Sequence, residues 1–260
     1  MSRIAETFAR LKRARRGGFI PFITAGDPDL KTTELLLVEL AAAGADIIEL
    51  GVPFSDPVAD GEVIQHASER ALRNGVTLRD ALTCVSRAKQ HADLPIVLFS
   101  YFNPLLKFGA DQLADEAKRV GVDGILVTDL IPEEASRWTE TLRKRGLDPI
   151  FLAAPTTSDK RLTTIAKHAS GFIYAVSRAG VTGARSEMSR DAEALVTRVR
   201  SVSDLPAAVG FGISTPEQVR QVWAFADAAV IGSAIVSQIE RLSNSPDLVK
   251  RVGEFTRSLI

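Results

Sequence analysis

The sequence places one carboxylate inside an apolar stretch. Glu49 lies near the end of the short run 46–50, in which its immediate neighbours are apolar. An ionised carboxylate is costly to bury among apolar side chains unless it has a partner or a task. Desolvation would raise its pKa, which suits a general acid or base near neutral pH. The alternative is a structural glutamate that accepts a hydrogen bond from a neighbouring serine or tyrosine.

Further carboxylates follow in the segment 52–61. Asp60 comes eleven residues after Glu49, so a loop that folds back over the strand end would bring both side chains around one small ligand. The segment is long for a strand-to-helix connection, which favours a functional lid. The alternative for Asp60 is the N-cap of a helix that opens at Gly61. We interpret Asp56 as a turn residue without a catalytic role.

Three glycine-rich turns follow the last three apolar runs, at residues 179–183, 210–214 and 231–234. Backbone amides can approach an anion closely only where side chains are absent, and helix N-termini favour negative charge. Three such turns after neighbouring strands predict a phosphate site. Such a site needs no lysine.

The positions of the lysines, histidines and the cysteine limit the types of reaction that the protein can catalyse. No lysine ends a predicted strand, which argues against a Schiff-base aldolase. His66, His91 and His168 lie on helical segments without ligand spacing, so we assign them surface or packing roles and expect no metal site. Cys84 has no paired histidine in its helical segment and is predicted to pack in the core.

Short apolar runs, which must position these residues, alternate with amphipathic stretches along the whole chain. The predicted strands span residues 19–24, 46–50, 95–101, 124–128, 149–153, 171–176, 207–210 and 228–231. Predicted helices between them include 32–43, 133–145 and 216–225. Near-continuous apolar strands are typical of a parallel sheet buried on both faces.

The rhythm of about one strand–helix unit per 32 residues predicts an α/β fold, a (β/α)8 TIM barrel that forms a single domain over residues 1–260. Extra helices are expected at 3–15, before the first strand, and at 62–73, after the second. An open doubly wound sheet is the alternative, but the glycine-rich dinucleotide turn is missing after the first strand.

Composition excludes several classes of protein. Lys plus Arg and Asp plus Glu each number 32, and this zero net charge argues against general nucleic-acid binding. We interpret the basic run 10–16 as a solvated helix face. Acidic residues interrupt the most apolar region, 35–54, so no membrane span is expected. A single cysteine and the lack of a signal-peptide pattern favour a cytoplasmic location.

Four runs together resemble the tryptophan synthase alpha chain family, the indole-3-glycerol-phosphate lyases. They are residues 21–28 (Pro-Phe-Ile-Thr-Ala-Gly-Asp-Pro), 49–61, 177–183 (Ser-Arg-Ala-Gly-Val-Thr-Gly) and 210–214 (Gly-Phe-Gly-Ile-Ser). Matching positions extend from residue 21 to Ser233. The resemblance implies retro-aldol cleavage of indole-3-glycerol phosphate to indole and glyceraldehyde 3-phosphate, with no cofactor in this chain.

The resemblance also assigns roles. Glu49 would be the acid and base that protonates the indole ring carbon and handles the reacting hydroxyl. Asp60 would accept the indole N–H and stabilise the developing positive charge. Thr182 would hold Asp60 when its loop closes, and Tyr174 would donate a hydrogen bond to Glu49. Two larger sets follow from the same likeness. The phosphate would be held by Gly183, Gly212, Gly232 and Ser233. The indole would be walled by Phe22, Phe99, Tyr101, Leu126, Thr128, Leu152, Tyr174 and Phe211, for which barrel packing is the alternative.

The family acts with a beta subunit that carries pyridoxal phosphate and receives the indole, in an assembly of two alpha and two beta chains. Asp56, Pro57, Asn103 and Pro104 match its partner-facing positions. Two alternatives stay open. One is a free-standing lyase that releases indole, and the other is a non-catalytic barrel that regulates its partner when it binds a phosphate ligand.

Overall fold

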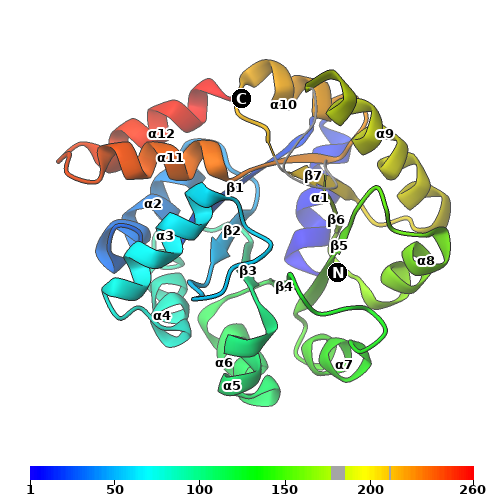
Figure 1. The fold of residues 1–260 in the computed structure, drawn as a ribbon, viewed down its shortest axis with the longest axis horizontal. Coiled ribbons are helices and arrows are strands. Elements are labelled where there is room, and N and C mark those ends of the chain that lie inside the picture. Colours follow the sequence, from blue (N-terminus) through cyan, green and yellow to red (C-terminus); the bar gives the residue numbers. More distant parts are fainter. Residues whose placement is uncertain (177–184, 211) are drawn as a thin grey trace.

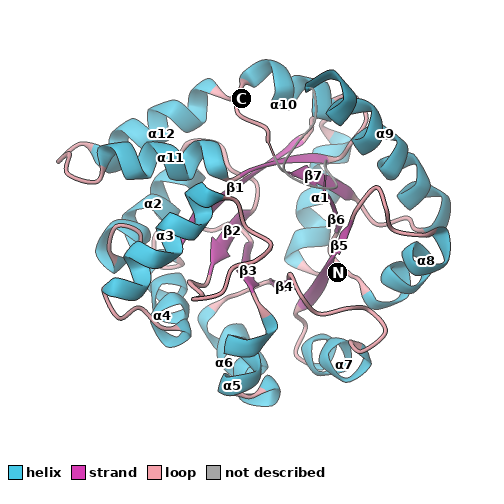
Figure 2. Cartoon of the chain, in the orientation of Figure 1, coloured by secondary structure: helices cyan, strands magenta, loops and turns pink. Residues whose placement is uncertain are grey.

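The computed structural model describes residues 1–176, 185–210 and 212–260, with the side chains of residues 185–189 excepted. Eight parallel strands pair in sequence order, and the last pairs with the first, so the sheet closes into a barrel. Figures 1 and 2 show the strands at the centre and a ring of helices around them. The predicted TIM barrel is therefore confirmed, and the open doubly wound sheet is excluded.

The strands lie close to their predicted positions. They are β1 (Gly18–Thr24), β2 (Ile48–Gly51), β3 (Ile96–Ser100), β4 (Gly124–Val127), β5 (Asp148–Ala153), β6 (Ile173–Val176), β7 (Ala207–Gly210) and β8 (Ala228–Ile231). The helices are α1 (Arg3–Arg13), α2 (Leu30–Ala42), α3 (Glu62–Arg73), α4 (Leu78–Ala88), α5 (Phe102–Phe108), α6 (Ala110–Val120), α7 (Ser136–Lys144), α8 (Asp159–His168), α9 (Arg185–Val202), α10 (Pro216–Trp223), α11 (Ser233–Leu242) and α12 (Leu248–Ser258). The extra helices predicted before the first strand and after the second are α1 and α3.

Several element boundaries differ from prediction by one to three residues, and three of them have local reasons. The second strand starts at Ile48, because the Asp46 carboxylate is engaged below it by the Phe19 amide at 3.0 Å and by Arg16 at 2.5 Å. The sixth starts at Ile173, because Gly171 has a φ of +76°. The helix predicted from residue 133 begins at Ser136, after a turn.

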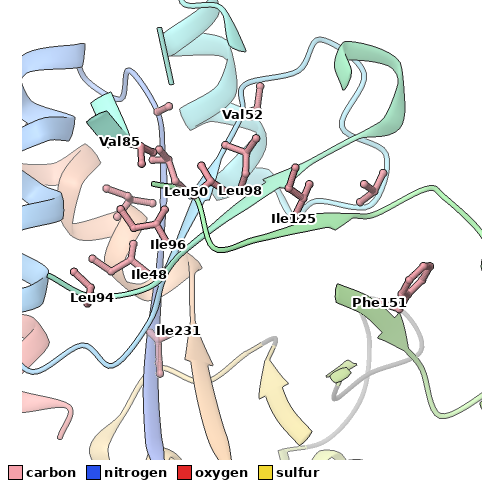
Figure 3. Close-up of a cluster of buried hydrophobic side chains, with 14 of the residues drawn as sticks. Ile48, Leu50, Val52, Val85, Leu94, Ile96, Leu98, Ile125, Phe151 and Ile231 are labelled. Carbon is pink, nitrogen blue, oxygen red and sulfur yellow. The ribbon is translucent and has the colours of Figure 1, made fainter. Parts of the chain in front are cut away.

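Side-chain alternation along the strands separates two apolar layers. The outer faces of the strands pack against the helices in one large cluster, and Figure 3 shows Leu50, Leu98 and Val85 of α4 within it. A second cluster fills the barrel interior and includes Ile20 and Phe22 of β1. Because β2 turns Ile48 and Leu50 outward, the residue between them points inward.

Helix α1 closes the amino-terminal end of the barrel. Its apolar residues Ile4, Phe8 and Leu11 belong to the interior cluster, and the Phe8 ring lies 5.8 Å from that of Phe172 at an angle of 54°. Figure 1 shows this helix across the middle of the barrel, inside the outer ring of helices. The end of the barrel that carries the strand carboxyl termini is left for the functional loops.

None of the helices in the described part of the chain is both long and apolar enough to cross a membrane.

Candidate active site

Glu49 lies on β2 with its side chain inside the barrel. Its backbone is in register with Phe22 on one neighbouring strand and Val97 on the other, both part of the interior cluster. The residue is 1% exposed, and among the described residues neither carboxylate oxygen has a hydrogen-bond partner. Burial raises the pKa of Glu49 to about 8. At neutral pH the buried side chain therefore holds a proton that it can give away.

The alternative of a structural, hydrogen-bonded glutamate is therefore wrong for the described part of the chain. The bond expected from Tyr174 to Glu49 is wrong as well, since Glu49 accepts none there. The side chains are still neighbours, because the negative charges of Glu49 and Asp60 both help to raise the pKa of Tyr174 well above its usual range, although burial is the larger cause. Both carboxylates thus lie near one tyrosine at the mouth of the barrel.

Asp60 is held by contacts from Tyr101, which follows β3, and from Gln65 of α3. The Tyr101 hydroxyl donates to Asp60 Oδ2 at 3.2 Å and accepts from the Ala59 amide at 2.9 Å, while Gln65 Nε2 donates to the Asp60 carbonyl at 2.8 Å. Burial raises the pKa of Asp60 to about 6, and the bond from Tyr101 partly opposes that rise. Asp60 is therefore mostly ionised at neutral pH, in contrast to Glu49.

Asp60 does not cap α3. The N-cap is Gly61, and no side chain there bonds to the first turn of the helix. The N-cap alternative for Asp60 is therefore wrong, and its carboxylate is available to a ligand. The local sequence does not decide between Asp60 and Gly61, since both residue types are common at N-caps.

The loop that carries Asp60 packs on the same tyrosine. The rings of Phe54 and Tyr101 stack with centroids 5.0 Å apart. Farther along the loop, Asp56 is exposed and accepts a hydrogen bond from Ser55 at 2.5 Å, which agrees with its interpretation as a turn residue. Tyr101, predicted only as part of an indole wall, thus positions both the loop and its carboxylate.

Three of the four residues predicted to bind the phosphate are described, Gly212, Gly232 and Ser233. They follow the neighbouring strands β7 and β8. Gly232 directly follows β8, and α11 starts at Ser233 with no side-chain cap bond at its N-cap, Gly232. Gly212 follows β7 and has a φ of +81°, a conformation that favours glycine. By contrast, Thr215 and Gln218 form a capping box at the start of α10. The first turn of α11 therefore keeps amides for an anion.

Three of the predicted site residues, Thr182, Gly183 and Phe211, lie outside the described residues.

The predicted indole wall lines the barrel interior. Phe22, Phe99, Leu126 and Tyr174 belong to the interior cluster, and Leu152 packs against it. The rings of Phe22 and Phe99 meet edge to face at 5.3 Å. A Cβ at Gly210 would lie 2.0 Å from the Tyr174 hydroxyl, so β7 must have a glycine there. Thr128 donates to the Ser100 carbonyl at 3.3 Å, at the end of β3.

Sequence reasoning missed a partly buried ion-pair network around Arg70. Arg70 of α3 binds Asp27 through two bonds, of 2.8 and 3.0 Å, and binds Glu240 of α11 at 2.6 Å. Asp27 is 1% exposed. The network joins the loop after β1, the helix after the Asp60 loop and the helix that starts at the predicted phosphate site. The partners are 43 and 170 residues apart, so no local pattern predicts them.

Thr24 was also missed, although its position carries a signal. It is the last residue of β1, where barrel enzymes place functional side chains, and it is 2% exposed. Its hydroxyl has no hydrogen-bond partner among the described residues. The rule that selected Glu49, a polar residue at the carboxyl end of an apolar strand, also selects Thr24.

No group of three or more His, Cys, Asp or Glu side chains in the described part of the chain is arranged to hold a metal ion. Cys84 is buried, and its thiol lies 3.6 Å from the Leu30 carbonyl, as a packing residue should.

Residues 8–259 match the family described as "Tryptophan synthase alpha chain". The chain is 49% identical to the protein of that name from Citrifermentans bemidjiense, covering all of this chain and 97% of that one. It is also 49% identical to the protein of that name from Geobacter sulfurreducens, covering all of this chain and 98% of the other.

Solved structures of similar sequence have the same fold as this chain. Tryptophan synthase subunit alpha from Legionella pneumophila superimposes with a TM-score of 0.92 at 38% identity, covering all of this chain and 97% of the other. A chain of the aminoacrylate-bound tryptophan synthase from M. tuberculosis superimposes with a TM-score of 0.88 at 35% identity, covering all of both chains.

Proposed function

The chain belongs to the tryptophan synthase alpha chain family, and we propose that Glu49 and Asp60 are the two carboxyl groups that perform its chemistry. Chains of this family are lyase subunits of tryptophan biosynthesis that cleave indole-3-glycerol phosphate to indole and glyceraldehyde 3-phosphate. The observation that carries the assignment is the contrast between the two sites: the Glu49 carboxyl is buried and has no hydrogen-bond partner among the described residues, whereas Tyr101 donates a hydrogen bond to the Asp60 carboxylate. Burial raises the pKa of Glu49 to about 8 and that of Asp60 to about 6.

The reaction needs one proton to move from the substrate hydroxyl to the indole ring carbon. Glu49, protonated before the reaction, gives its proton to that carbon, and the ring nitrogen becomes positive. Asp60, ionised and held by Tyr101, accepts the N–H and stabilises this charge. The Glu49 carboxylate then takes the hydroxyl proton, the carbon–carbon bond breaks, and its electron pair neutralises the ring as the aldehyde forms. Glu49 ends protonated, as it began, but it now holds the proton from the substrate hydroxyl, while its original proton is on the ring carbon of the free indole.

We propose that the phosphate binds at the glycine turns after β7 and β8, with Gly212, Gly232 and Ser233 as contacts and Gly183 as a further one. The N-terminus of α11 supports this, because its first amides and its helix dipole favour an anion. Phe22, Tyr101, Thr128 and Tyr174 would hold the indole together with Phe211, and Thr182 would secure Asp60. Acid and base groups suffice for this step, so we propose no cofactor for it in this chain.

Replacing Gly212 with valine should weaken phosphate capture. A Cβ at a φ of +81° strains the turn and disturbs the amides offered to the anion. Hydrogen bonds to charged groups contribute about 1.5–3 kcal/mol, so we expect roughly a 10- to 100-fold rise in the Kd of 3-indolepropanol phosphate, measured by calorimetry.

The matched control is Gly75→Val. Gly75 also has a positive φ, of +72°, but it is exposed and an added Cβ there meets no atom within 4 Å. It introduces the same kind of backbone strain in an exposed turn after α3, outside the glycine turns that follow β7 and β8, and should leave the affinity unchanged. Equal effects of the two variants would contradict the phosphate assignment.

Membership of an alpha chain family implies a beta-subunit partner. We propose that this partner carries pyridoxal phosphate, that it receives the indole, and that two alpha and two beta chains assemble. Asp56, Pro57, Asn103 and Pro104 are the proposed contacts. Three large apolar side chains in nearby loops and in α5 support this surface, since Val58 is 88%, Leu106 59% and Ile131 41% exposed.

The experiment that tests the function follows free indole from the purified chain and indole-3-glycerol phosphate, with and without a tryptophan synthase beta subunit. We expect indole from the chain alone and a higher rate with the partner. Release that the partner does not change would favour the free-standing lyase. A chain that binds phosphate ligand but releases no indole under either condition would favour the regulatory alternative.

We further propose that residues 1–260 act as one domain and that the chain works in the cytoplasm. Its one cysteine, which is buried, is consistent with a reducing compartment.

A further inference from the structure

Thr24 has a buried hydroxyl that the described fold leaves unsatisfied. The residue ends β1 and is 2% exposed, and its Oγ1 has no hydrogen-bond partner among the described residues. Leaving a buried hydroxyl without a partner is destabilising, and valine has nearly the same shape without that cost. A threonine at this place therefore needs a reason beyond packing.

The hydroxyl lies on the inner face of the barrel. Strand residues two apart share a face, and Ile20 and Phe22 of β1 both belong to the interior cluster. Ile23, next to Thr24 in sequence, belongs instead to the outer cluster between strands and helices. Thr24 therefore faces inward, one residue pair nearer the mouth than Phe22.

Strand β1 lies between the two ends of the proposed substrate site. On one side Phe22 is in register with Glu49, and on the other Pro21 is in register with Ile231, the residue before Gly232. A Cβ at Gly232 would lie 3.7 Å from the Cβ of Phe22, so the phosphate turn directly borders this strand. The three carbons of the substrate that join the phosphate to the indole beside Glu49 would therefore pass across the mouth end of β1.

The register also places Thr24 beside Gly51. Gly51 has no side chain, and a Cβ there would lie 2.5 Å from the Phe22 ring. At this level the inner surface of the barrel therefore has the Thr24 hydroxyl on β1 and the bare backbone of Gly51 on β2, and the Phe22 ring of β1 lies against Gly51. Among the described inward positions of β1 and β2 at the mouth, Thr24 and Glu49 are the polar ones.

We propose that the Thr24 hydroxyl binds the second hydroxyl of the substrate's glycerol chain, the one that the reaction does not convert into the aldehyde. This inference rests on the proposed function, because it takes the phosphate and the acid to lie where that proposal puts them. Thr24 then contributes to specificity: it recognises a hydroxylated three-carbon chain between the phosphate and the indole, and it fixes the rotation of that chain so that the reacting hydroxyl faces Glu49.

The test compares two ligands that differ only in these hydroxyl groups. Indole-3-glycerol phosphate has them, and 3-indolepropanol phosphate does not. Calorimetry would give the Kd of each for Glu49→Gln, in which turnover is blocked, and for the double variant Thr24→Val with Glu49→Gln. We expect Thr24→Val to weaken binding of the glycerol compound about tenfold, as loss of one hydrogen bond predicts, and to leave the Kd of the propanol compound within about twofold.

Thr24→Ser in the same background is the matched control, because it keeps the hydroxyl and removes only a methyl group; it should retain most of the affinity. An equal loss for both ligands would mean a structural role and overturn the inference, as would an unchanged affinity for the glycerol compound. Failure of the proposed function would look different: Glu49→Gln would still release indole in these samples, or it would bind neither ligand.

Discussion

Replacing Glu49 with glutamine should reduce indole release by about 10²- to 10⁴-fold, the range that a positioned acid or base contributes. Glutamine has the same shape as protonated glutamate but has no proton to give to the indole ring. The interior around Glu49 is apolar and offers no other acid on β2. Steady-state assays of free indole measure the loss, and retention of more than a few per cent of the wild-type rate would contradict the assignment.

Binding and stability provide the controls for Glu49→Gln. The Kd of 3-indolepropanol phosphate should change little, because the glycine turns lie on other strands. The stability of the wild-type chain should also contain a pH-dependent part that this variant lacks. The folded-state pKa of about 8 exceeds the ordinary value of 4.5, so between these values the folded state keeps a proton that the unfolded state has lost. The contribution of Glu49 to stability is therefore present at low pH and is lost as pH rises through about 8.

Replacing Asp60 with asparagine should lower the rate by about 10²- to 10³-fold, as expected when a group that stabilises the charge of the transition state is removed. Asparagine can still accept the indole N–H, but it carries no negative charge to oppose the positive ring. The Gln65 bond goes to the backbone carbonyl of Asp60, so the loop should keep its position. Pre-steady-state measurement of indole formation separates this loss from product release.

The pH dependence of the rate gives Asp60→Asn a second readout. In the wild-type chain the rate should rise as Asp60 ionises around pH 6 and fall as Glu49 loses its proton around pH 8. Asp60→Asn should remove the rise of the rate around pH 6, the acid limb of the pH–rate profile, and keep the fall around pH 8, its alkaline limb. Tyr101→Phe should instead shift the acid limb to higher pH, because the bond from Tyr101 lowers the pKa of Asp60. An unchanged acid limb in Asp60→Asn would exclude Asp60 as the group that must be ionised.

The barrel could be predicted from sequence because its signals are local. Eight apolar runs, each separated by helical patterns, mark strands buried on both faces, and all eight strands form within about two residues of their predicted positions. Glu49 could be predicted for the same reason, since one carboxylate in an apolar strand is visible without any tertiary information. Its position within β2 then determines that it faces the interior.

The contacts around Asp60 could not be predicted in this way. The partner of its carboxylate, Tyr101, is 41 residues away, between β3 and α5. The network of Arg70 joins elements up to 170 residues apart. The exposed apolar residues Val58 and Leu106 were missed because a single apolar residue in a loop or on a short helix looks the same whether it turns inward or outward. Thr24 differs from these residues because its signal is local, but a hydroxyl costs less to bury than a carboxylate and is therefore a weaker signal in an apolar strand than Glu49.

Helix α1 fills the amino-terminal end of the barrel, where Ile4, Phe8 and Leu11 pack into the interior cluster of the described residues. We therefore expect substrate to enter and products to leave at the opposite end, where the strands finish. The indole and the triose phosphate would then leave from the same end of the barrel. A partner protein that takes up the indole directly would have to lie against that end, where it would also control the entry of the next substrate molecule.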